Sequence, residues 1–315
     1  MNQNTSRKKQ AKLRRKQRTV RFANRPYVEQ KRRKMFRKAL FTGLFLGITA
    51  SLCKAPLLHA LAQKEISQKT ALIVQDDSKE FGATPLEDAE TEEKLAELAQ
   101  QDKDIAEIYA NKDLYPGELL KALASNQEMT EFVKGYLTAD KEAAGGISAD
   151  EAKQAFPLFI QWDKRWGYVP YGKKSNIGIS GCGPACMSMV IFALTRDESA
   201  TPDALAAFSV ENGYYMEGEG TAWLFMKDAA AAYGLNAREL GLDEAVIRQY
   251  LDNGNPVICA MRPGDFTTSG HFIVIYGYDE KGLLINDPNS RERSGRHWDF
   301  EDIKWQIRNL WGYSR

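Results

Sequence analysis

The sequence predicts an α+β domain over residues 155–315, in which a buried helix packs on an antiparallel sheet, with a short all-α segment before it. Two patterns support this prediction. A glycine-rich loop leads into residues 182–194, which are apolar almost all round, as in a helix buried on every side. Three later apolar runs, each bounded by glycine or polar residues, have the pattern of buried strands and occupy residues 256–261, 271–277 and 283–288.

Charge divides the chain into two unequal parts. The formal net charge is only +1 over 315 residues, but residues 1–38 contain 16 Lys and Arg and one acid, Glu29. This basic arm carries +15, while the remainder, with 27 basic and 41 acidic residues, carries −14. Such an arm could attract nucleic acid. Because a hydrophobic segment follows it directly and no recognisable nucleic-acid-binding fold accompanies it, we expect a cytoplasmic arm and no nucleic-acid partner.

Residues 39–62 are predicted to be a signal peptide or a membrane anchor. The apolar run from 39 to 53 is short for a membrane helix, which needs roughly 20 residues, and suits a signal-peptide core of about 7 to 15. Ala60, Leu61 and Ala62 have the small-x-small form of a signal-peptidase site. Both interpretations keep the basic arm in the cytoplasm. We therefore expect the rest of the chain to be extracytoplasmic, either anchored by residues 39–62 or secreted after cleavage near Ala62.

Two segments separate this region from the α+β domain. Residues 63–92 are mostly polar and acidic and are predicted to be a linker. Residues 93–140 place apolar side chains at helical intervals, which predicts three short amphipathic helices. These helices could form a pro-segment that covers an active site, but we favour helices that simply pack on the next domain. Ala144, Gly145 and Gly146 mark a second joint.

Cys182 is the candidate nucleophile. It lies where the glycine-rich loop, with Gly178, Gly181 and Gly183, enters the predicted buried helix, and Pro184 suits the first helical turn. The amides and partial positive charge of a helix N-terminus stabilise an anion, which favours the nucleophilic thiolate. The alternative is a buried structural cysteine, which is how we interpret Cys186, one turn further on.

His271 and Asp287 complete a candidate triad. His271 opens a predicted strand directly after Gly270, and Asp287 follows the end of the next strand. In an antiparallel pair, residues near the start of one strand and the end of the next become neighbours. Asp287 can therefore orient the His271 ring, although a core histidine held by a backbone carbonyl remains an alternative. His297 lies in a polar loop and is expected to have a surface role.

Attack of a thiolate on a carbonyl group also needs a hydrogen-bond donor for the oxyanion that forms. The backbone amide of Cys182 can supply one hydrogen bond. Side-chain candidates are Gln161, in an aromatic-rich segment, and Asn176, six residues before the thiol. The sequence leaves both open, and we favour Gln161 because its segment is expected to pack beside the catalytic helix.

Scarce residues argue against a metal or a cofactor. The chain has only three histidines, and no pair of them at helical spacing flanks a glutamate as in the common zinc-peptidase motif. Cys182 and Cys186 lack the second Cys or His pair of a zinc finger. We predict no metal and no cofactor.

At these residues the sequence resembles a known family. The ordered motifs are 161–166 (QWDKRW), 181–184 (GCGP), 270–272 (GHF) and 286–288 (NDP). Together they are similar to papain-like cysteine peptidases related to the bacteriocin-processing, double-glycine leader peptidases, in their free-standing exported branch. The resemblance covers residues 155–315 and implies a papain-like fold with Cys182 as nucleophile, His271 as base and Asp287 as orienting acid. It departs at Asn176, where the leader peptidases usually carry Gln.

The predicted function is therefore an exported cysteine peptidase that hydrolyses peptide bonds in a peptide or protein substrate. Two alternatives stay open. One is a cell-wall peptide amidase of related architecture, and the other is a catalytically inactive papain-like module that binds peptides. The sequence does not indicate the oligomeric state or the cleavage specificity.

Overall fold

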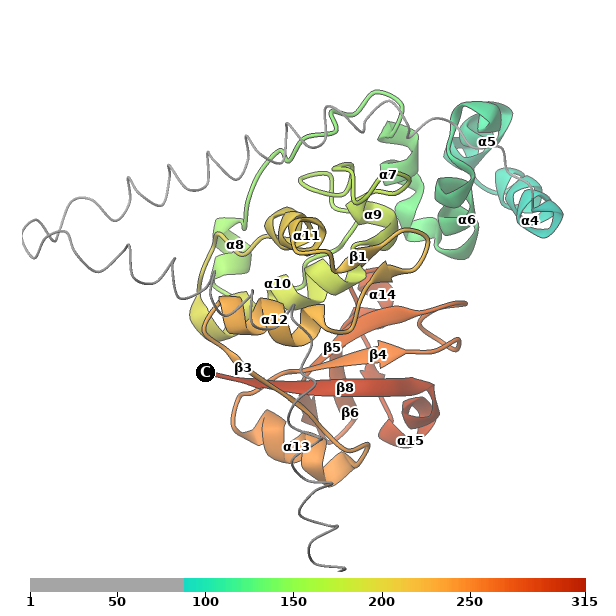
Figure 1. The fold of residues 1–315 in the computed structure, drawn as a ribbon. Helices are drawn as coiled ribbons and strands as arrows, with labels where there is room; N and C mark the ends of the chain where they lie inside the picture. Colours follow the sequence, from blue (N-terminus) through green and yellow to red (C-terminus); the bar gives the residue numbers. More distant parts are fainter. Residues whose placement is uncertain (1–87) are drawn as a thin grey trace, which may run out of the picture. The chain divides into compact units, whose positions relative to one another are not determined.

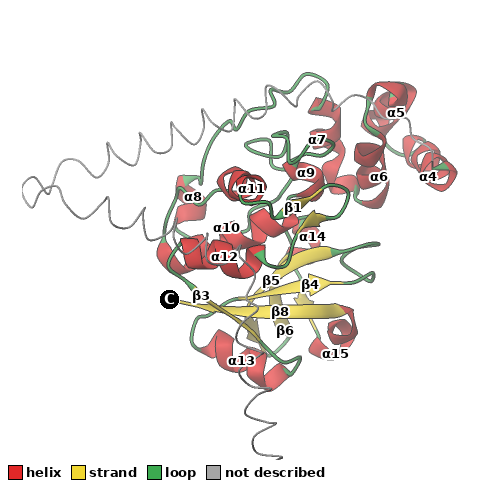
Figure 2. Cartoon of the chain, in the orientation of Figure 1, coloured by secondary structure: helices red, strands yellow, loops and turns green. Residues whose placement is uncertain are grey.

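A computed structural model of the chain describes residues 88–315 (Figures 1 and 2). The basic arm, the predicted signal or anchor at 39–62 and the linker up to residue 87 lie outside the described residues. Within residues 88–315, no helix is both long and apolar enough to cross a bilayer.

The helical segment, which we define as residues 88–136, contains four short α-helices rather than three. These are α4 (Ala89–Ala99), α5 (Lys103–Ala110), α6 (Gly117–Ser125) and α7 (Thr130–Gly135), with 3₁₀ turns η1 (Lys112–Leu114) and η2 (Gln127–Met129) between them. The first expected helix is split because the Asp102 carboxylate accepts hydrogen bonds from the amides of Asp104 and Ile105 and so starts a new helix. Asp88 caps α4 in the same way, so the helical segment begins within the stretch expected to be linker.

A six-stranded antiparallel sheet forms the centre of the α+β domain. Its strand order is β3-β8-β4-β5-β6-β7, made by β3 (Asn236–Glu239), β4 (Val257–Met261), β5 (His271–Asp279), β6 (Gly282–Asn286), β7 (His297–Trp298) and β8 (Ile307–Ser314). The three predicted strands are confirmed as β4, β5 and β6. A separate two-stranded hairpin pairs β1 (Tyr215–Met216) with β2 (Gly220–Thr221).

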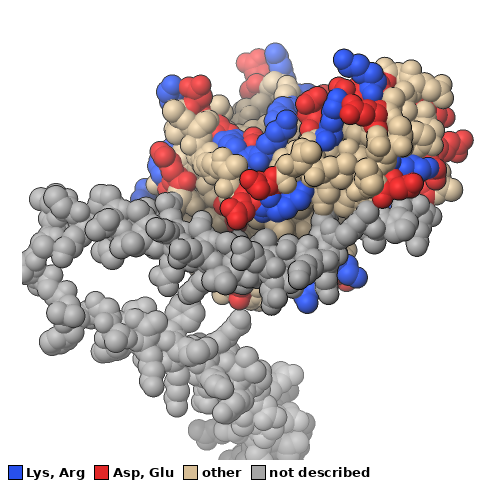
Figure 3. Space-filling model, turned by 90° about the horizontal axis from the view of Figure 1, so that it is seen from above, with Lys and Arg blue, Asp and Glu red and all other residues tan. Residues whose placement is uncertain are grey.

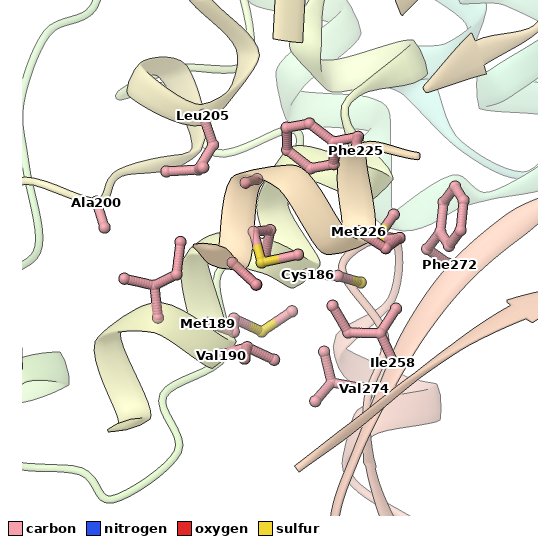
Figure 4. Close-up of a cluster of buried hydrophobic side chains, with 14 of the residues drawn as sticks. Cys186, Met189, Val190, Ala200, Leu205, Phe225, Met226, Ile258, Phe272 and Val274 are labelled. Atoms are coloured by element: carbon pink, nitrogen blue, oxygen red, sulfur yellow. The ribbon is translucent and has the colours of Figure 1, made fainter. Parts of the chain in front are cut away.

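The predicted buried helix is α10 (Cys182–Thr195), in which every residue from 183 to 192 is buried. It lies on one face of the sheet together with α12 (Phe225–Ala232), as Figure 1 shows. In Figure 4, Met189 and Val190 of this helix lie against Ile258 of β4 and Val274 of β5. An apolar helix packed on a sheet face that is itself apolar gives the domain a dense core.

Other helices cover the opposite face and the edges. Apolar side chains of α13 (Glu244–Asp252) and α15 (Phe300–Ile303) pack against the alternate residues of β4 and β5 on the second face. The remaining elements are α8 (Ala149–Ala152), α9 (Ile177–Ser180), α11 (Pro202–Glu211), α14 (Arg291–Ser294) and η3 (Lys304–Gln306). Because both faces are covered, β4 is buried along its whole length.

The surface carries both signs of charge. On the face drawn in Figure 3, Lys and Arg side chains alternate with Asp and Glu, and that face has no extended patch of one sign among the described residues.

The contact between α10 and the sheet should dominate stability. Ile258 is fully buried in it, so Ile258→Ala removes apolar contacts and leaves a cavity. We expect a loss of about 2 to 5 kcal/mol in the free energy of unfolding, measured by urea denaturation. Leu242→Ala is the matched control, because Leu242 is 48% exposed and should lose far less. Equal losses in the two variants would contradict this account of the core.

Candidate active site

Cys182 lies at the point where α10 leaves the core. It is the first residue of the helix and is half-buried, whereas the residues that follow it are buried. The N-cap is Gly181, which has no side chain to bond the free amides. Since Pro184 lacks an N–H, the amides of Cys182 and Gly183 are the first-turn donors that have no acceptor within the helix. This end of α10 can therefore hold a thiolate or an oxyanion.

The hairpin of β1 and β2 packs closely beside this point. A Cβ at Gly183 would lie 2.8 Å from the hydroxyl oxygen of Thr221, closer than such atoms approach, so only glycine fits there. The Thr221 hydroxyl also hydrogen bonds the Tyr171 hydroxyl at 2.7 Å. The hairpin thereby forms a fixed wall next to Cys182.

The other two cysteines of the described chain differ from Cys182. Cys186 and Cys259 are fully buried, and burial raises the pKa of both thiols. Neither thiol is positioned to ionise, which agrees with a structural role for Cys186.

His271 is the first residue of β5 and pairs with Met261 of β4. Its Nε2 lies 2.7 Å from Oδ1 of Asp287, and the Cys182 side chain is near enough to raise the pKa of the ring. Because Nε2 is engaged by the carboxylate, Nδ1 is the ring atom available to the sulfur. The structure therefore brings together the three residues that the sequence singled out.

Charge around His271 favours the imidazolium. Burial alone would lower the pKa of this histidine. The negative charge of Asp287, the hydrogen bond to it and the interaction with Cys182 outweigh burial and raise the pKa of His271 from 6.5 to about 10. A protonated ring beside the sulfur is the arrangement that stabilises a thiolate.

Asp287 is completely buried, and its carboxylate has three partners. Besides His271, it accepts a hydrogen bond from the backbone amide of Asn289 at 2.7 Å and from Nε of Arg293 at 2.5 Å. Burial would raise the pKa of Asp287, but the charges and hydrogen bonds of His271 and Arg293 lower it below 3.8. Arg293 thus keeps the carboxylate paired even when His271 gives up its proton.

Arg293 and Asn289 are partners that the sequence analysis missed. The available signal was local, because Ser290 is a residue type that favours a helix N-cap and Arg293 follows it three residues later. In the structure, the Ser290 hydroxyl accepts a hydrogen bond from the Arg293 amide at 3.0 Å. This short turn folds Arg293 back onto Asp287.

The two candidate oxyanion donors, Gln161 and Asn176, differ in which end of the side-chain amide is free of hydrogen bonds. Nε2 of Gln161 donates to the carbonyl oxygens of Gly178 at 2.9 Å and Ile179 at 3.2 Å, so its donor is engaged. Oδ1 of Asn176 accepts from the Ile179 amide at 3.0 Å, which leaves Nδ2 as the free end. Within residues 88–315, Oε1 of Gln161 and Nδ2 of Asn176 are buried without a partner. A free donor suits an oxyanion and a free acceptor does not, so Asn176 has the kind of free amide end that this role needs.

His297 pairs with a different carboxylate from that of His271. It lies in β7, is 30% exposed at its side chain and pairs with Asp279 at 2.8 Å. Across residues 88–315, no three His, Cys, Asp or Glu side chains converge as a metal-binding group.

Comparison with known proteins places these observations in a family. The model of the Peptidase_C39-like family matches residues 153–314, about half of the chain. The chain belongs to the Peptidase_C39-like family. The predicted papain-like α+β fold and the relation to bacteriocin-processing peptidases are thereby confirmed. No curated protein matches the chain.

Several solved structures are similar to the chain. The peptidase domain of Streptococcus ComA, described as a bi-functional ABC transporter in quorum sensing, is 22% identical over 42% of this chain and 89% of its own, with a TM-score of 0.33. A putative C39-like peptidase from Bacillus anthracis is 14% identical over 54% of this chain and 98% of its own, with a TM-score of 0.32.

The raised pKa of His271 links stability to pH. Protonation stabilises the folded state, so this contribution is complete below pH 6.5 and is lost as pH rises toward about 10. The contribution of Asp287 has the opposite sign and is lost below pH 3.8. We expect the free energy of unfolding to fall more steeply between pH 6.5 and 10 in the wild-type protein than in His271→Gln. Urea denaturation at a series of pH values measures this difference.

The control for this prediction is His297→Gln, which removes the exposed histidine and should keep the wild-type pH profile. Parallel profiles for the wild-type protein and His271→Gln would contradict the linkage.

Proposed function

We propose that this protein hydrolyses peptide bonds as an exported thiol peptidase, with Cys182 as nucleophile, His271 as acid and base, and Asp287 as the orienting group. The observation that carries the proposal is the His271 ring, hydrogen bonded to the buried Asp287 and electrostatically coupled to the Cys182 thiol. Membership of a cysteine peptidase family is consistent with it.

The chemistry follows from the protonation states. The Cys182 thiolate attacks the scissile carbonyl, and the His271 imidazolium then donates its proton to the leaving amine. The neutral ring next takes a proton from water, which attacks the thioester and releases the acid. Asp287, held by Arg293 and Asn289, keeps the ring aligned throughout both steps.

The oxyanion is held by two donors in this proposal. One is the Cys182 amide at the start of α10, and the other is Nδ2 of Asn176. Gln161 has a different role in this proposal. Its Nε2 donates hydrogen bonds to the carbonyls of Gly178 and Ile179 and so holds the loop that carries the nucleophile.

The contacts of the site bear differently on the two alternative functions, a peptide-binding module and a cell-wall peptide amidase. A peptide-binding module that has lost catalysis has no need for a buried carboxylate aligned on a histidine beside a thiol. Burying such a carboxylate is costly. A cell-wall peptide amidase would use the same acyl chemistry, so it is distinguished by its substrate. The export of the domain rests on the basic arm at 1–38 and the apolar segment at 39–62.

Loss of the sulfur should end catalysis. We expect Cys182→Ala to reduce hydrolysis of a mixed peptide library to the level without enzyme, because no other group forms the acyl intermediate. Asp287→Ala should retain a remnant, with kcat lower by about 10⁴-fold, since the ring loses its orientation. Mass spectrometry of the digest, and kinetics on one cleaved peptide, measure both effects.

The matched control is Cys259→Ala, which removes a buried thiol from the other face of the sheet and should remain active. Full activity of Asp287→Ala would show that another residue orients His271. Cleavage of wall peptides but not of the library would favour the amidase.

The oxyanion assignment is tested by Asn176→Ser. Serine can cap α9 in place of asparagine but has no amide to reach the oxyanion, so kcat should fall by about 10²- to 10³-fold with little change in KM. Gln161→Ala should instead lower thermal stability, because the loop carbonyls of Gly178 and Ile179 lose their donor. If Asn176→Ser keeps its kcat while folded Gln161→Ala loses it, Gln161 is the donor.

A further inference from the structure

The helical segment shares a hydrophobic core with the peptidase domain. Residues Leu119, Leu123 and Phe132 of the segment form one buried cluster with Ile160, Trp162 and Tyr168 of the domain. The Phe132 and Tyr168 rings stack with centroids 4.4 Å apart, and the Tyr168 hydroxyl donates to the Phe132 carbonyl at 2.9 Å. Separating the two would expose apolar surface on both sides.

The segment also supports the loop that carries the nucleophile. Phe132 lies against Gly178, four residues before Cys182 in the sequence. A Cβ at Gly178 would lie 2.4 Å from the Phe132 ring, so the ring can approach only because the residue is glycine. The position of this loop thus depends on a side chain outside the peptidase domain.

A second set of contacts reaches the loop after Asp287. Nδ2 of Asn126 donates to the Asn289 carbonyl at 2.5 Å. The carboxylate of Glu128 accepts from the Ser290 hydroxyl and from the Arg291 amide, the latter at 2.8 Å. Asn126 and Asn289 are 163 residues apart in sequence, so this contact exists only in the folded chain.

These contacts connect directly to the triad. Asn289, whose carbonyl accepts from Asn126, donates its own amide to Oδ1 of Asp287 at 2.7 Å. Ser290, which bonds Glu128, accepts the amide of Arg293, whose guanidinium bonds the other oxygen of Asp287. Besides His271, the partners of the Asp287 carboxylate are therefore linked to the helical segment, Asn289 directly and Arg293 through Ser290.

We propose that the helical segment is a permanent part of the enzyme, in which Asn126 and Glu128 are positioning residues that hold Asp287 on His271. This inference rests on the proposed function, and it decides the role of a segment for which the sequence left two interpretations open. A pro-segment that blocks the site must leave for activity to appear. A segment that orients the triad must stay.

The physical basis is the buried polar surface of the Asp287 loop. Without Glu128, the Ser290 hydroxyl and the Arg291 amide lose a charged acceptor, and without Asn126 the Asn289 carbonyl keeps only Nε1 of Trp162. A loop with unpaired groups shifts until water or other partners satisfy them. A shift of about 1 Å at the orienting group can reduce a rate by about 10²-fold.

The test uses the full chain with Glu128→Gln and Asn126→Ala. A glutamine has one acceptor oxygen where the carboxylate has two, so at least one donor of the loop is left unpaired. Two readouts need no substrate: the rate at which iodoacetamide alkylates Cys182 between pH 5 and 9, and the titration of the His271 ring by NMR. We expect alkylation at pH 7 to slow by about tenfold to a hundredfold and His271 to titrate at lower pH in both variants.

Matched controls separate positioning from general destabilisation. Glu131→Gln alters a carboxylate whose pair with Lys164 at 4.0 Å is exposed, and Gln127→Ala alters an amide that bonds only carbonyls of the segment. Both should keep wild-type alkylation and titration. Thermal denaturation checks that each variant is folded, and Glu128→Gln provides the decisive result if Asn126→Ala does not fold.

Two results would overturn the inference. One is unchanged alkylation and unchanged His271 titration in folded Glu128→Gln. The other is faster alkylation after proteolytic release of the helical segment, which would make it a pro-segment. Failure of the proposed function looks different, because the wild-type thiol would then react like free cysteine while the His271 titration still reported whether Glu128 positions Asp287.

Discussion

The arrangement of the site depends on one buried negative charge. An isolated carboxylate in the core of a protein costs several kcal/mol, so Asp287 must be matched by partners that are themselves fixed. His271 supplies a positive ring, Arg293 a second positive charge and Asn289 a backbone amide. His271 and Asn289 bond one oxygen of the carboxylate and Arg293 bonds the other, so the carboxylate is held at both oxygens while it orients the His271 ring.

Two rigid elements carry the reacting groups, and the helical segment contacts the loop that carries Asp287. Cys182 begins a helix whose next ten residues are buried against the sheet, and His271 begins a strand paired on its β4 side through Met261. Groups at the ends of packed elements move less than groups on long loops. The loop after β6 is held by its own hydrogen bonds, such as that from the Asp287 amide to the Ser294 hydroxyl, and by the contacts of Asn126 and Glu128.

Family membership and site geometry answer different questions. The family identifies a papain-like cysteine peptidase fold, which a peptidase, an amidase and a binding module can all share. The paired His271 and Asp287, the half-buried thiol and the free donor of Asn176 bear on whether this chain retains the chemistry.

The sequence by itself determined the element boundaries that carry the chemistry. Cys182, His271 and Asp287 lie where glycine or polar residues meet apolar runs, and such boundaries are encoded locally. The predicted number of helices before the domain was wrong. The Asp102 side chain caps a new helix at a point where the apolar periodicity had predicted one continuous helix. Only the tertiary structure shows which end of the Gln161 and Asn176 side-chain amides is already bonded, since both residues carry the same group. It alone revealed Asn126 and Glu128, because contacts between residues more than 160 positions apart leave no local pattern.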